Sequence, residues 1–385
     1  MTDRADDCGP PRILHLHSTF AAGGKERRAV RLMNAFGEHV SHAVVSGVPG
    51  ELSAANEIDS GVDVDYPDEF PALSGKPTPW RLQAMAQAMA GYDLVLTYNW
   101  GAMDAVMAHT LFGKAIALPP LIHHEDGFNA DEQLKLKRGR NWYRRIALGR
   151  ASGLVVPSET LEGIALTTWS QPFGRVRRIP NGIDTAAFAA KPKPDALRGV
   201  IKHEGELWVG TVAGLRSVKA LPRLVRAFAA LPEPWQLVIV GEGNELDAIR
   251  AEASHLGVDH RLHLPGFVPD PANYIGLFDI FALSSLSEQF PISLVEAMAA
   301  GLPAAAPAVG DIREMVAEEN EPFIVEPGDI AALSMALVSL AADGDLRRSV
   351  GEANRAKARA EFDEAKMIAA YRRLYSSALG REIPA

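Results

Sequence analysis

Cysteine is almost absent from this sequence, because its 385 residues include only one, Cys8. A single thiol cannot form an internal disulfide, which excludes a disulfide-stapled scaffold and favours a reducing compartment. An excess of basic residues is also missing: 48 acidic residues outnumber 39 lysines and arginines, and the net charge is −9. A general nucleic-acid binder is expected to show the opposite balance, so we expect no nucleic acid as a partner.

Long hydrophobic runs are missing as well. The most apolar stretch, residues 297–309, is interrupted by a glycine and two prolines and is shorter than the roughly 20 residues of a membrane-spanning helix. Residues 1–8 contain three acids and no apolar core, so we expect neither a secretory signal nor a transit peptide. These absences predict a cytoplasmic protein that is soluble or, at most, peripheral on the inner face of the plasma membrane.

What the sequence does contain is a regular alternation of short apolar segments and longer helical patterns. This alternation is typical of parallel sheets with crossover helices. In the first half we expect strands at 12–17, 42–46, 93–98, 115–123 and 153–157, and helices at 24–36, 80–90, 102–111 and 131–150. In the second half we expect strands at 207–213, 236–240, 261–264, 279–283 and 304–306, and helices at 221–230, 245–256, 293–300 and 330–340.

Two domains are expected, because 385 residues with 47% hydrophobic composition exceed one ordinary core. Segment 178–184 carries Pro and Asn-Gly turn chemistry, and a low-complexity run follows it. The closing segment 362–379 has apolar residues at helical spacing, so we expect an amphipathic helix that packs back onto the fold. The predicted domains are residues 1–178 with 362–385, and residues 179–361.

A pair of glycines, Gly23 and Gly24, follows the first expected strand and opens a helix. Glycine lets the backbone approach a ligand closely, and a helix N-terminus supplies free N–H groups that suit a phosphate or a sugar hydroxyl. A plain strand-to-helix turn explains the same residues, so the pair alone is a weak signal.

Two acids frame the most specific string in the sequence, Glu288-Gln-Phe-Pro-Ile-Ser-Leu-Val-Glu296. Pro291 fits the first turn of a helix, so the loop would bring Glu288 and nearby backbone N–H groups to the carboxyl end of a strand. Glu296 lies one to two turns inside that helix, where a carboxylate can hold a diol such as a ribose. A capping role for Glu288 and a surface position for Glu296 are the alternatives.

Two further strings place titratable residues at expected strand ends. Arg216 and Lys219 lie on the loop after strand 207–213, where two cations would neutralise a diphosphate. His123 and His124 end a strand of the first half and are candidates for proton transfer or for holding a reacting hydroxyl. Solvation of the two cations and packing of the two histidines stay open as alternatives.

Taken together and in this order, the four strings resemble the GT-B fold glycosyltransferases, specifically the retaining glycosyltransferase family four. The resemblance extends from Arg12 to Leu379, and its most specific element is Glu288 to Glu296, which is similar to the family's E-x7-E motif. It implies an α/β protein with two Rossmann-like parallel-sheet domains that face each other across a central cleft. The N-terminal domain would be the acceptor side, and the C-terminal domain would bind the nucleotide sugar.

The resemblance also implies roles for individual residues toward a UDP-, GDP- or ADP-sugar. Glu288 would bind the donor sugar, and Glu296 would bind the ribose hydroxyls. Lys219 matches a diphosphate-binding lysine, whereas Arg216 stands one to two residues beyond the family's arginine. His123 matches the histidine near the reaction centre, with His124 in reserve, so His123 and Glu288 are the expected catalytic residues. The remaining donor contacts would come from Gly23, Gly24, Phe267, Val268, Gln289, Phe290, Pro291 and Ile292.

The implied reaction transfers a sugar with retention of configuration to a growing polysaccharide or a lipid-linked saccharide. Because negative charge grows on the leaving diphosphate, Arg216, Lys219 and helix N-termini would stabilise it. Neither a metal nor another cofactor is expected, and the Asp-x-Asp strings at 63–65 and 343–345 receive no ligand role. The alternatives are a GT-B nucleotide-sugar epimerase or phosphorylase, and a non-catalytic nucleotide-sugar-binding partner of a polysaccharide assembly system.

Residues 135–150 form a basic segment with seven cations and no acid, in which Trp142 and Tyr143 also lie. A basic amphipathic helix with aromatic residues is typical of a membrane-surface element. A solvated helix face is the alternative, and the sequence leaves both open.

Overall fold

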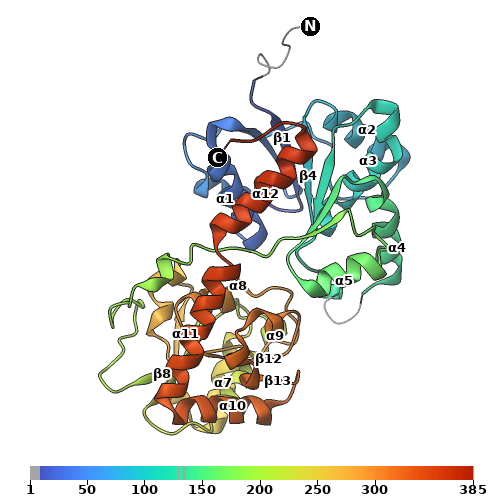
Figure 1. Ribbon diagram of the computed structural model, residues 1–385. Coiled ribbons are helices and arrows are strands. Elements are labelled where there is room, and N and C mark those ends of the chain that lie inside the picture. Colours follow the sequence, from blue (N-terminus) through green and yellow to red (C-terminus); the bar gives the residue numbers. More distant parts are fainter. Residues whose placement is uncertain (1–8, 129, 133–135, 385) are drawn as a thin grey trace. The chain divides into compact units, whose positions relative to one another are not determined.

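The computed structural model describes residues 9–128, 130–132 and 136–384 of the chain (Figure 1). Cys8 and Lys135, which entered the sequence analysis, lie outside these residues. Among the helices that the structure describes, none combines the length and the apolar character that crossing a bilayer requires.

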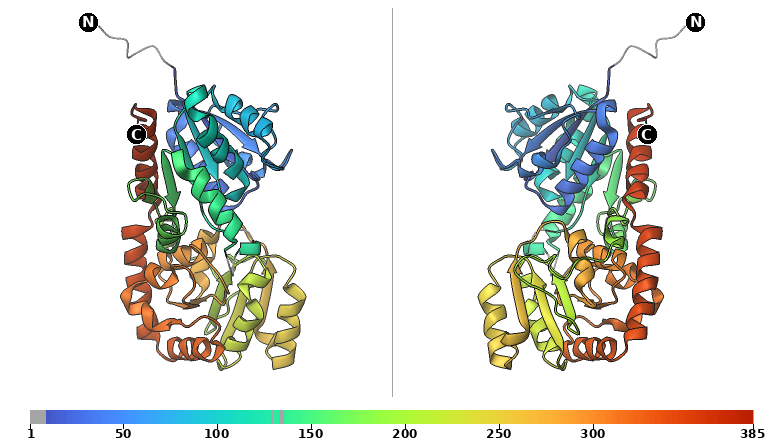
Figure 2. Two further views of the ribbon diagram at one scale, coloured as in Figure 1. Left: turned by 90° about the vertical axis from the view of Figure 1, so that its right-hand side faces the viewer. Right: turned by 90° about the vertical axis from the view of Figure 1, so that its left-hand side faces the viewer.

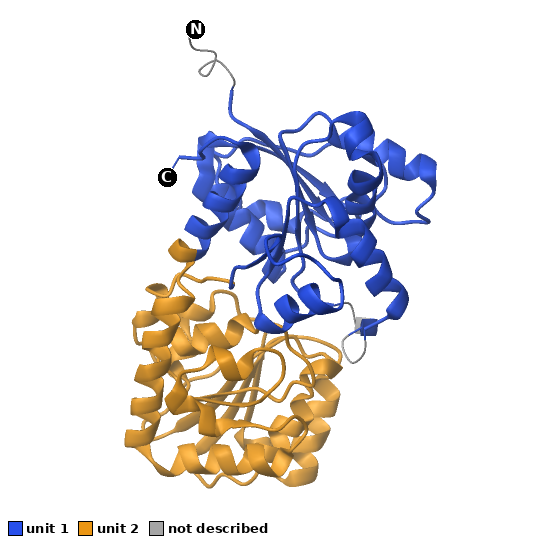
Figure 3. Ribbon diagram, turned by 45° about the vertical axis from the view of Figure 1, so that its right-hand side comes forward, with its two compact units in different colours: residues 1–180, 367–385 blue, residues 181–366 orange. Residues whose placement is uncertain are grey.

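The chain divides into two compact units (Figure 3). Unit 1 consists of residues 1–180 and 367–385, and unit 2 consists of residues 181–366. The chain therefore passes between the units twice, after Pro180 and after Lys366, whereas the sequence suggested divisions after residues 178 and 361.

Unit 1 is built on a parallel sheet whose described strands follow the order β3-β2-β1-β4-β5-β6-β7. The strands are β1 (Arg12–His17), β2 (Ser41–Ser46), β3 (Val64–Asp65), β4 (Leu94–Tyr98), β5 (Leu121–His124), β6 (Gly153–Val156) and β7 (Val176–Arg178). Helices α1 (Gly24–Phe36), α2 (Pro79–Met89), α3 (Met103–Ile116), α4 (Arg138–Ala147), α5 (Glu159–Thr167) and the end of α12 (Glu364–Leu379) surround it.

The two faces of the unit-1 sheet differ in chemistry, because alternate strand residues point to opposite sides. Leu14 and Leu16 of β1 pack with residues of α2, α3 and α5 in an apolar core. The other face packs against α1 and α12, and Figure 2 shows helices on both sides of the sheet. On this second face, buried histidines and tyrosines replace part of the apolar core.

Unit 2 repeats the arrangement with the strand order β10-β9-β8-β11-β12-β13. Its described strands are β8 (Leu207–Val212), β9 (Trp235–Val240), β10 (Leu262–Gly266), β11 (Ile280–Ala282), β12 (Ala304–Pro307) and β13 (Ile324–Val325). Its helices are α6 (Leu221–Phe228), α7 (Leu246–Leu256), α8 (Ile292–Ala299), α9 (Ile312–Met315), α10 (Ile330–Ala342) and α11 (Gly344–Glu361). Both sheets have the strand order of a Rossmann fold, so the predicted class of two Rossmann-like parallel-sheet domains is confirmed.

Three predicted elements were wrong in extent. The helix expected at 102–111 is α3, which spans Met103–Ile116 and so ends later than predicted. The single helix at 131–150 is instead a 3-10 turn at Ala130–Glu132 and a helix that begins at Arg138, because the Lys137 N–H donates to Glu132 Oε1 at 3.0 Å. The strand expected at 115–123 begins only at Leu121, because α3 continues to Ile116 and Pro119-Pro120 follows.

Candidate functional site

The strings that contain Lys219 and Glu288 meet at the carboxyl edge of the unit-2 sheet. β8 and β11 are neighbours in the sheet, although β9 and β10 lie between them in the sequence. The loops after β8 and β11 both leave the sheet at this edge. Lys219 Nζ lies 2.5 Å from Glu288 Oε1, and the two side chains are 14% and 10% exposed. In open parallel sheets this switch point is where ligands bind, so the pair occupies the expected position for a binding group.

Two serines that the sequence analysis did not single out hold this pair in place. Ser284 Oγ donates to the backbone oxygens of Lys219 and Ala220 at 2.9 and 3.2 Å. Ser285 Oγ donates to Glu288 Oε1 at 2.6 Å. Ala220 has a left-handed backbone, with φ of +49°, which ends the Ser217–Lys219 turn and starts α6. The serine pair before Glu288 was the sequence signal for this role.

Glycines allow neighbouring loops to approach the same edge closely. A Cβ on Gly310 would lie 2.3 Å from the backbone oxygen of Glu288, and Gly310 has φ of +58°. A Cβ on Gly243 would lie 2.3 Å from the backbone oxygen of Leu215, directly before Arg216. Both loops that carry the proposed donor contacts are therefore packed backbone to backbone, which makes them rigid.

Arg216, the second expected cation, is exposed at the end of the same loop. Its backbone N–H donates to the oxygen of Gly214 at 2.8 Å, and its side chain passes within 3.5 Å of a Cβ built on Gly214. The structure thus places Arg216 and Lys219 at the two ends of one short turn, Ser217–Lys219. Of these two cations, Arg216 is exposed and Lys219 is paired with Glu288.

Glu296 lies on α8, close enough to Tyr274 for its charge to act on the phenol. Tyr274 in turn contacts the segment that contains Phe267 and Val268. The Tyr274 hydroxyl donates to the Val268 oxygen at 3.3 Å. Burial and the nearby Glu296 carboxylate both raise the pKa of Tyr274. Phe267 is 62% exposed, so its ring is free to contact a planar ligand. Tyr274, which sequence reasoning missed, therefore lies near both Glu296, the expected ribose ligand, and Val268, an expected donor contact.

The residues between the two acids divide into buried and accessible groups. Phe290 packs against Phe362 at 5.5 Å between ring centroids and joins the unit-2 core. Pro291 is buried directly before the first residue of α8, Ile292, so the helix begins where the sequence predicted. Both acids, Glu288 and Glu296, are partly exposed, so a ligand can reach them, whereas Gln289 Oε1 is buried.

In unit 1 the glycine pair and the histidine string lie side by side. Arg28 of α1 forms a two-pronged ion pair with Asp126, which follows β5. Gly23 ends the loop before α1, and Lys25 in the first turn pairs with Glu26. Burial lowers the pKa of Lys25 to about 8, with Asp126 opposing and Arg28 adding to the shift. Lys25, which the sequence analysis did not select, is therefore still mostly charged at pH 7 and loses its charge above about pH 8.

His123 and His124 point to opposite faces of the unit-1 sheet, so they cannot share a role. His123 Nδ1 is hydrogen-bonded to Thr97 Oγ1 at 2.8 Å, and its Nε2 lies 3.7 Å from Glu125 Oε2. His124 is hydrogen-bonded through Nε2 to the Tyr375 hydroxyl at 2.9 Å. Both rings are buried. His123 is the one that faces α3 and α4.

His124 belongs to a buried layer of aromatic and imidazole rings between the sheet, α1 and α12. His15 is hydrogen-bonded to Tyr98 at 3.1 Å and to His42 at 3.0 Å, and His17 stacks on Tyr98 at 3.9 Å. Burial first, and then Arg28, lowers the pKa of His124 to about 3. Burial also lowers the pKa of His42 to about 4, against the opposing charge of Asp63. These imidazoles are therefore neutral at neutral pH.

The basic segment splits into an inner and an outer face. Arg144 is fully buried, where it binds Glu125 and Glu132 at 3.2 Å each. By contrast Arg138, Trp142, Arg145 and Ile146 are exposed on the outer face of α4, with Trp142 63% exposed. The segment is thus not a uniformly solvated helix face, because Arg144 forms buried ion pairs with Glu125 and Glu132.

Comparison with known proteins places the chain among glycosyltransferases. Residues 194–357 match the family described as Glycosyl transferases group 1, and residues 22–187 match Glycosyltransferase Family 4. The two matches follow one another along the chain and include residues of both units.

The individual relatives and solved structures share about a fifth to a third of their residues with this chain. N-acetyl-alpha-D-glucosaminyl L-malate synthase of Bacillus anthracis is 26% identical over 54% of this chain and 55% of its own length. Phosphatidyl-myo-inositol mannosyltransferase of Mycolicibacterium smegmatis is 32% identical over 53% of each chain, so this chain spans about half the length of these relatives. The crystal structure of Anabaena HepE superposes with a TM-score of 0.78 and 21% identity, over 95% of this chain and 100% of HepE. With its two Rossmann-like units, its E-x7-E string and both family matches, the chain belongs to glycosyltransferase family four and has the GT-B fold.

Proposed function

We propose that this chain is a retaining glycosyltransferase that transfers a sugar from a nucleotide-diphosphate sugar to a growing polysaccharide or a lipid-linked saccharide. The observation that carries the proposal is the ion pair of Lys219 and Glu288, because it joins the specific Glu288–Glu296 string to the loop of Lys219 at the switch point of the unit-2 sheet. The relatives support the donor class, since HepE was crystallised with UDP-glucose.

The geometry suits a donor that carries a charged diphosphate. Lys219 and Arg216 stand at the ends of one turn and would offset charge that grows on the leaving group. Glu288, beside Lys219, would then hold a hydroxyl of the donor sugar, and Glu296 would bind the ribose. Because Lys219 and Arg216 would neutralise the diphosphate, the proposed reaction needs no metal ion. We therefore expect turnover to be unchanged in the presence of a strong chelator.

Nucleotide binding tests the proposal directly. We expect UDP, GDP or ADP to raise the melting temperature of the wild-type protein by mass action. Glu296→Ala is expected to weaken the affinity for that nucleotide about tenfold or more, because two charge-assisted hydrogen bonds to the ribose are lost. Calorimetric titration measures the affinity.

The matched control is Glu352→Ala, which removes an exposed helical glutamate of α11 in the same unit. Its nucleotide affinity is expected to equal that of the wild type. The absence of a shift with all three nucleotides and their sugars contradicts the transferase proposal. Equal affinities in the wild type and Glu296→Ala contradict only the ribose role.

A membrane contact on the cytoplasmic side is the second part of the proposal. The outer face of α4 presents Arg138, Arg145, Trp142 and Ile146, and no acid lies between residues 136 and 150. Leu111 of α3 and Phe173 are also exposed apolar side chains of unit 1, at 57% and 77%. Gln171, near Phe173, donates to the Arg145 oxygen at 3.5 Å, so the loop borders α4. Basic and apolar groups together suit an anionic lipid surface.

Charge reversal on this face is expected to weaken binding to anionic vesicles. Each cation near such a surface contributes about 1 kcal/mol, so Arg138→Glu with Arg145→Glu should lower the partition coefficient at least tenfold. Co-sedimentation with phosphatidylcholine vesicles, with and without phosphatidylglycerol, measures it. Arg144 is left intact because it is buried. Trp80→Ser, at an 81% exposed site on α2, is the control that should bind normally. Unchanged partitioning of the double variant refutes the contact.

A further inference from the structure

The side chains of Lys219 and Glu288 pair with each other, although each is expected to contact the donor. Lys219 Nζ and Glu288 Oε1 are 2.5 Å apart, and only 14% of the lysine side chain and 10% of the glutamate side chain are exposed. Water and salt screen an ion pair with so little exposure less than they screen one on the surface. A diphosphate that binds Lys219 must therefore compete with a carboxylate that is already in contact with it.

Hydrogen bonds between the two loops hold the carboxylate beside the cation. The Leu286 N–H donates to the Val218 oxygen at 2.8 Å, which joins the turn of Lys219 to the loop before Glu288. Ser285 is buried, and its hydroxyl donates at 2.6 Å to the same oxygen of Glu288 that Lys219 contacts. Glu288 can move away only by breaking the bond to Ser285, so the carboxylate stays at this position when a ligand enters.

The donor and the product of the proposed reaction differ at the group that Lys219 would bind. In a nucleotide sugar each phosphate carries one negative charge, because the second phosphate is esterified to the sugar. The terminal phosphate of a free nucleoside diphosphate loses its second proton at about pH 6, so it carries close to two charges at neutral pH. Glu288 repels this additional charge, whereas the sugar of the donor offers the same carboxylate a hydroxyl as a hydrogen-bond donor.

The other charged residues of the expected site act on donor and product alike. Arg216, at the start of the same turn, is exposed, so solvent screens its attraction for either ligand. Glu296, on α8, is expected at the ribose, which both ligands contain. Lys219 and Glu288 are therefore the charged pair at the part of the ligand in which donor and product differ.

We propose that Glu288 makes the site select the nucleotide sugar over the nucleoside diphosphate that the reaction releases. With the donor bound, Glu288 accepts a hydrogen bond from the sugar and Lys219 turns to the diphosphate. Once the sugar has been transferred, the carboxylate pairs with Lys219 again and repels the terminal phosphate. The ion pair thereby weakens product binding and speeds product release, a step that limits turnover in many enzymes. The identity of both ligands rests on the proposed transferase function.

Calorimetric titration of the full chain at neutral pH and constant salt compares the affinities for donor and product. The ligand pairs are UDP with UDP-glucose, GDP with GDP-mannose, and ADP with ADP-glucose. Glu288→Gln removes the charge and keeps the shape of the side chain, and Ser285 can still donate to the amide oxygen. Glu288→Ala is the second variant, because it removes the carboxylate without placing an amide beside Lys219.

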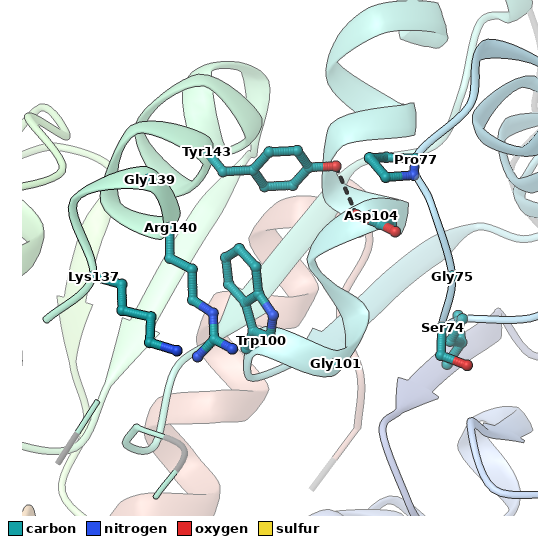
Figure 4. A pocket seen from close by; sticks show the side chains of 11 residues that line it. Ser74, Gly75, Pro77, Trp100, Gly101, Asp104, Lys137, Gly139, Arg140 and Tyr143 are labelled. Atoms are coloured by element: carbon teal, nitrogen blue, oxygen red, sulfur yellow. Dashed lines mark hydrogen bonds between the residues drawn. The ribbon is translucent and has the colours of Figure 1, made fainter. Parts of the chain in front are cut away.

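The matched control is Asp104→Asn in unit 1, which changes a carboxylate to an amide in a similar ion pair. Asp104 Oδ2 lies 2.7 Å from Arg81 Nη1, and the aspartate and arginine side chains are 18% and 16% exposed. Figure 4 shows Asp104 at the wall of a cavity of about 660 Å³, where the Tyr143 hydroxyl also donates to it at 2.6 Å. Its nucleotide affinities should equal those of the wild type, because the expected nucleotide contacts of Lys219 and Glu288 are intact.

Both Glu288 variants are expected to bind the nucleoside diphosphate about fivefold more tightly than the wild type, because the competing carboxylate is gone. Their affinity for the matching nucleotide sugar should not rise, since the lost hydrogen bond to the sugar offsets the lost repulsion. A folded variant whose affinity for the nucleoside diphosphate is unchanged or weaker overturns the inference, as does an equal gain for donor and product. Either result leaves the transferase proposal intact, whereas a wild type that binds no member of the three ligand pairs refutes both.

Discussion

Replacing Lys219 with alanine is expected to lower kcat/KM about a thousandfold, the largest functional effect that the structure predicts. Lys219 is 14% exposed and sits at the carboxyl edge of β8, so its charge acts in a partly dehydrated site. In the proposed reaction that charge stabilises the diphosphate as it leaves. The substitution also leaves Glu288 without this cation, although Ser285 still donates to it at 2.6 Å. The rate of nucleotide release from the sugar donor measures the effect.

A second ion pair in unit 2 provides a matched control. Lys202 Nζ lies 2.6 Å from Asp279 Oδ2, and the two side chains are 19% and 25% exposed. Asp279 precedes β11, whereas Glu288 follows it, so this pair lies at the opposite edge of the sheet. Lys202→Ala should destabilise unit 2 to a similar degree, about 1–3 kcal/mol, without slowing turnover. Equal loss of turnover in both variants would mean that Lys219 acts only through stability.

The elements that sequence reasoning predicted best are those with marked ends. β1 and α1 have the predicted bounds, because the glycine pair separates a buried strand from an amphipathic helix and Gly37 ends that helix. Strands β3 and β13 have two residues each, which is too short for any periodic pattern. They are held by pairing with β2 and β12, so tertiary structure and not local sequence forms them.

The candidate site shows the same division between local and tertiary information. The order of the strings predicted that the Lys219 and Glu288 loops share an edge, because parallel strands end on the same side. Alternation along a strand places neighbours such as His123 and His124 on opposite faces, but the local sequence does not show which partners each face supplies. Likewise Arg144 looked like one more surface cation, and only the position of Glu125 and Glu132 explains why it is buried.

The free energy of unfolding of unit 1 is expected to fall as the pH is lowered below about 6.5, because this unit buries several neutral histidines. Burial lowers the pKa of His15, His17, His42 and His124 in the folded protein, to about 4 for His42 and about 3 for His124. Their unfolded pKa is about 6.5, so the unfolded chain binds protons first as the pH falls. The stability from these groups is complete above about pH 6.5 and declines below it. For His42 and His124 this difference costs about 2–3 kcal/mol each at pH 4.5, which is a large part of the stability of a typical domain.

His17→Phe isolates this effect from general acid denaturation. His17 is fully buried, stacks on Tyr98, and neither of its ring nitrogens has a hydrogen-bond partner among the described residues. Burial, and next the charge of Lys25, opposes its protonation, and Arg28 adds to the effect. Phenylalanine keeps the stacking without the titrating group, so calorimetry from pH 7.5 to 4.5 should show a higher melting temperature at acid pH and a shallower decline. His39→Phe, at an exposed site, should follow the wild-type curve. A parallel decline in His17→Phe and the wild type would show that His17 is not among the groups that drive acid unfolding.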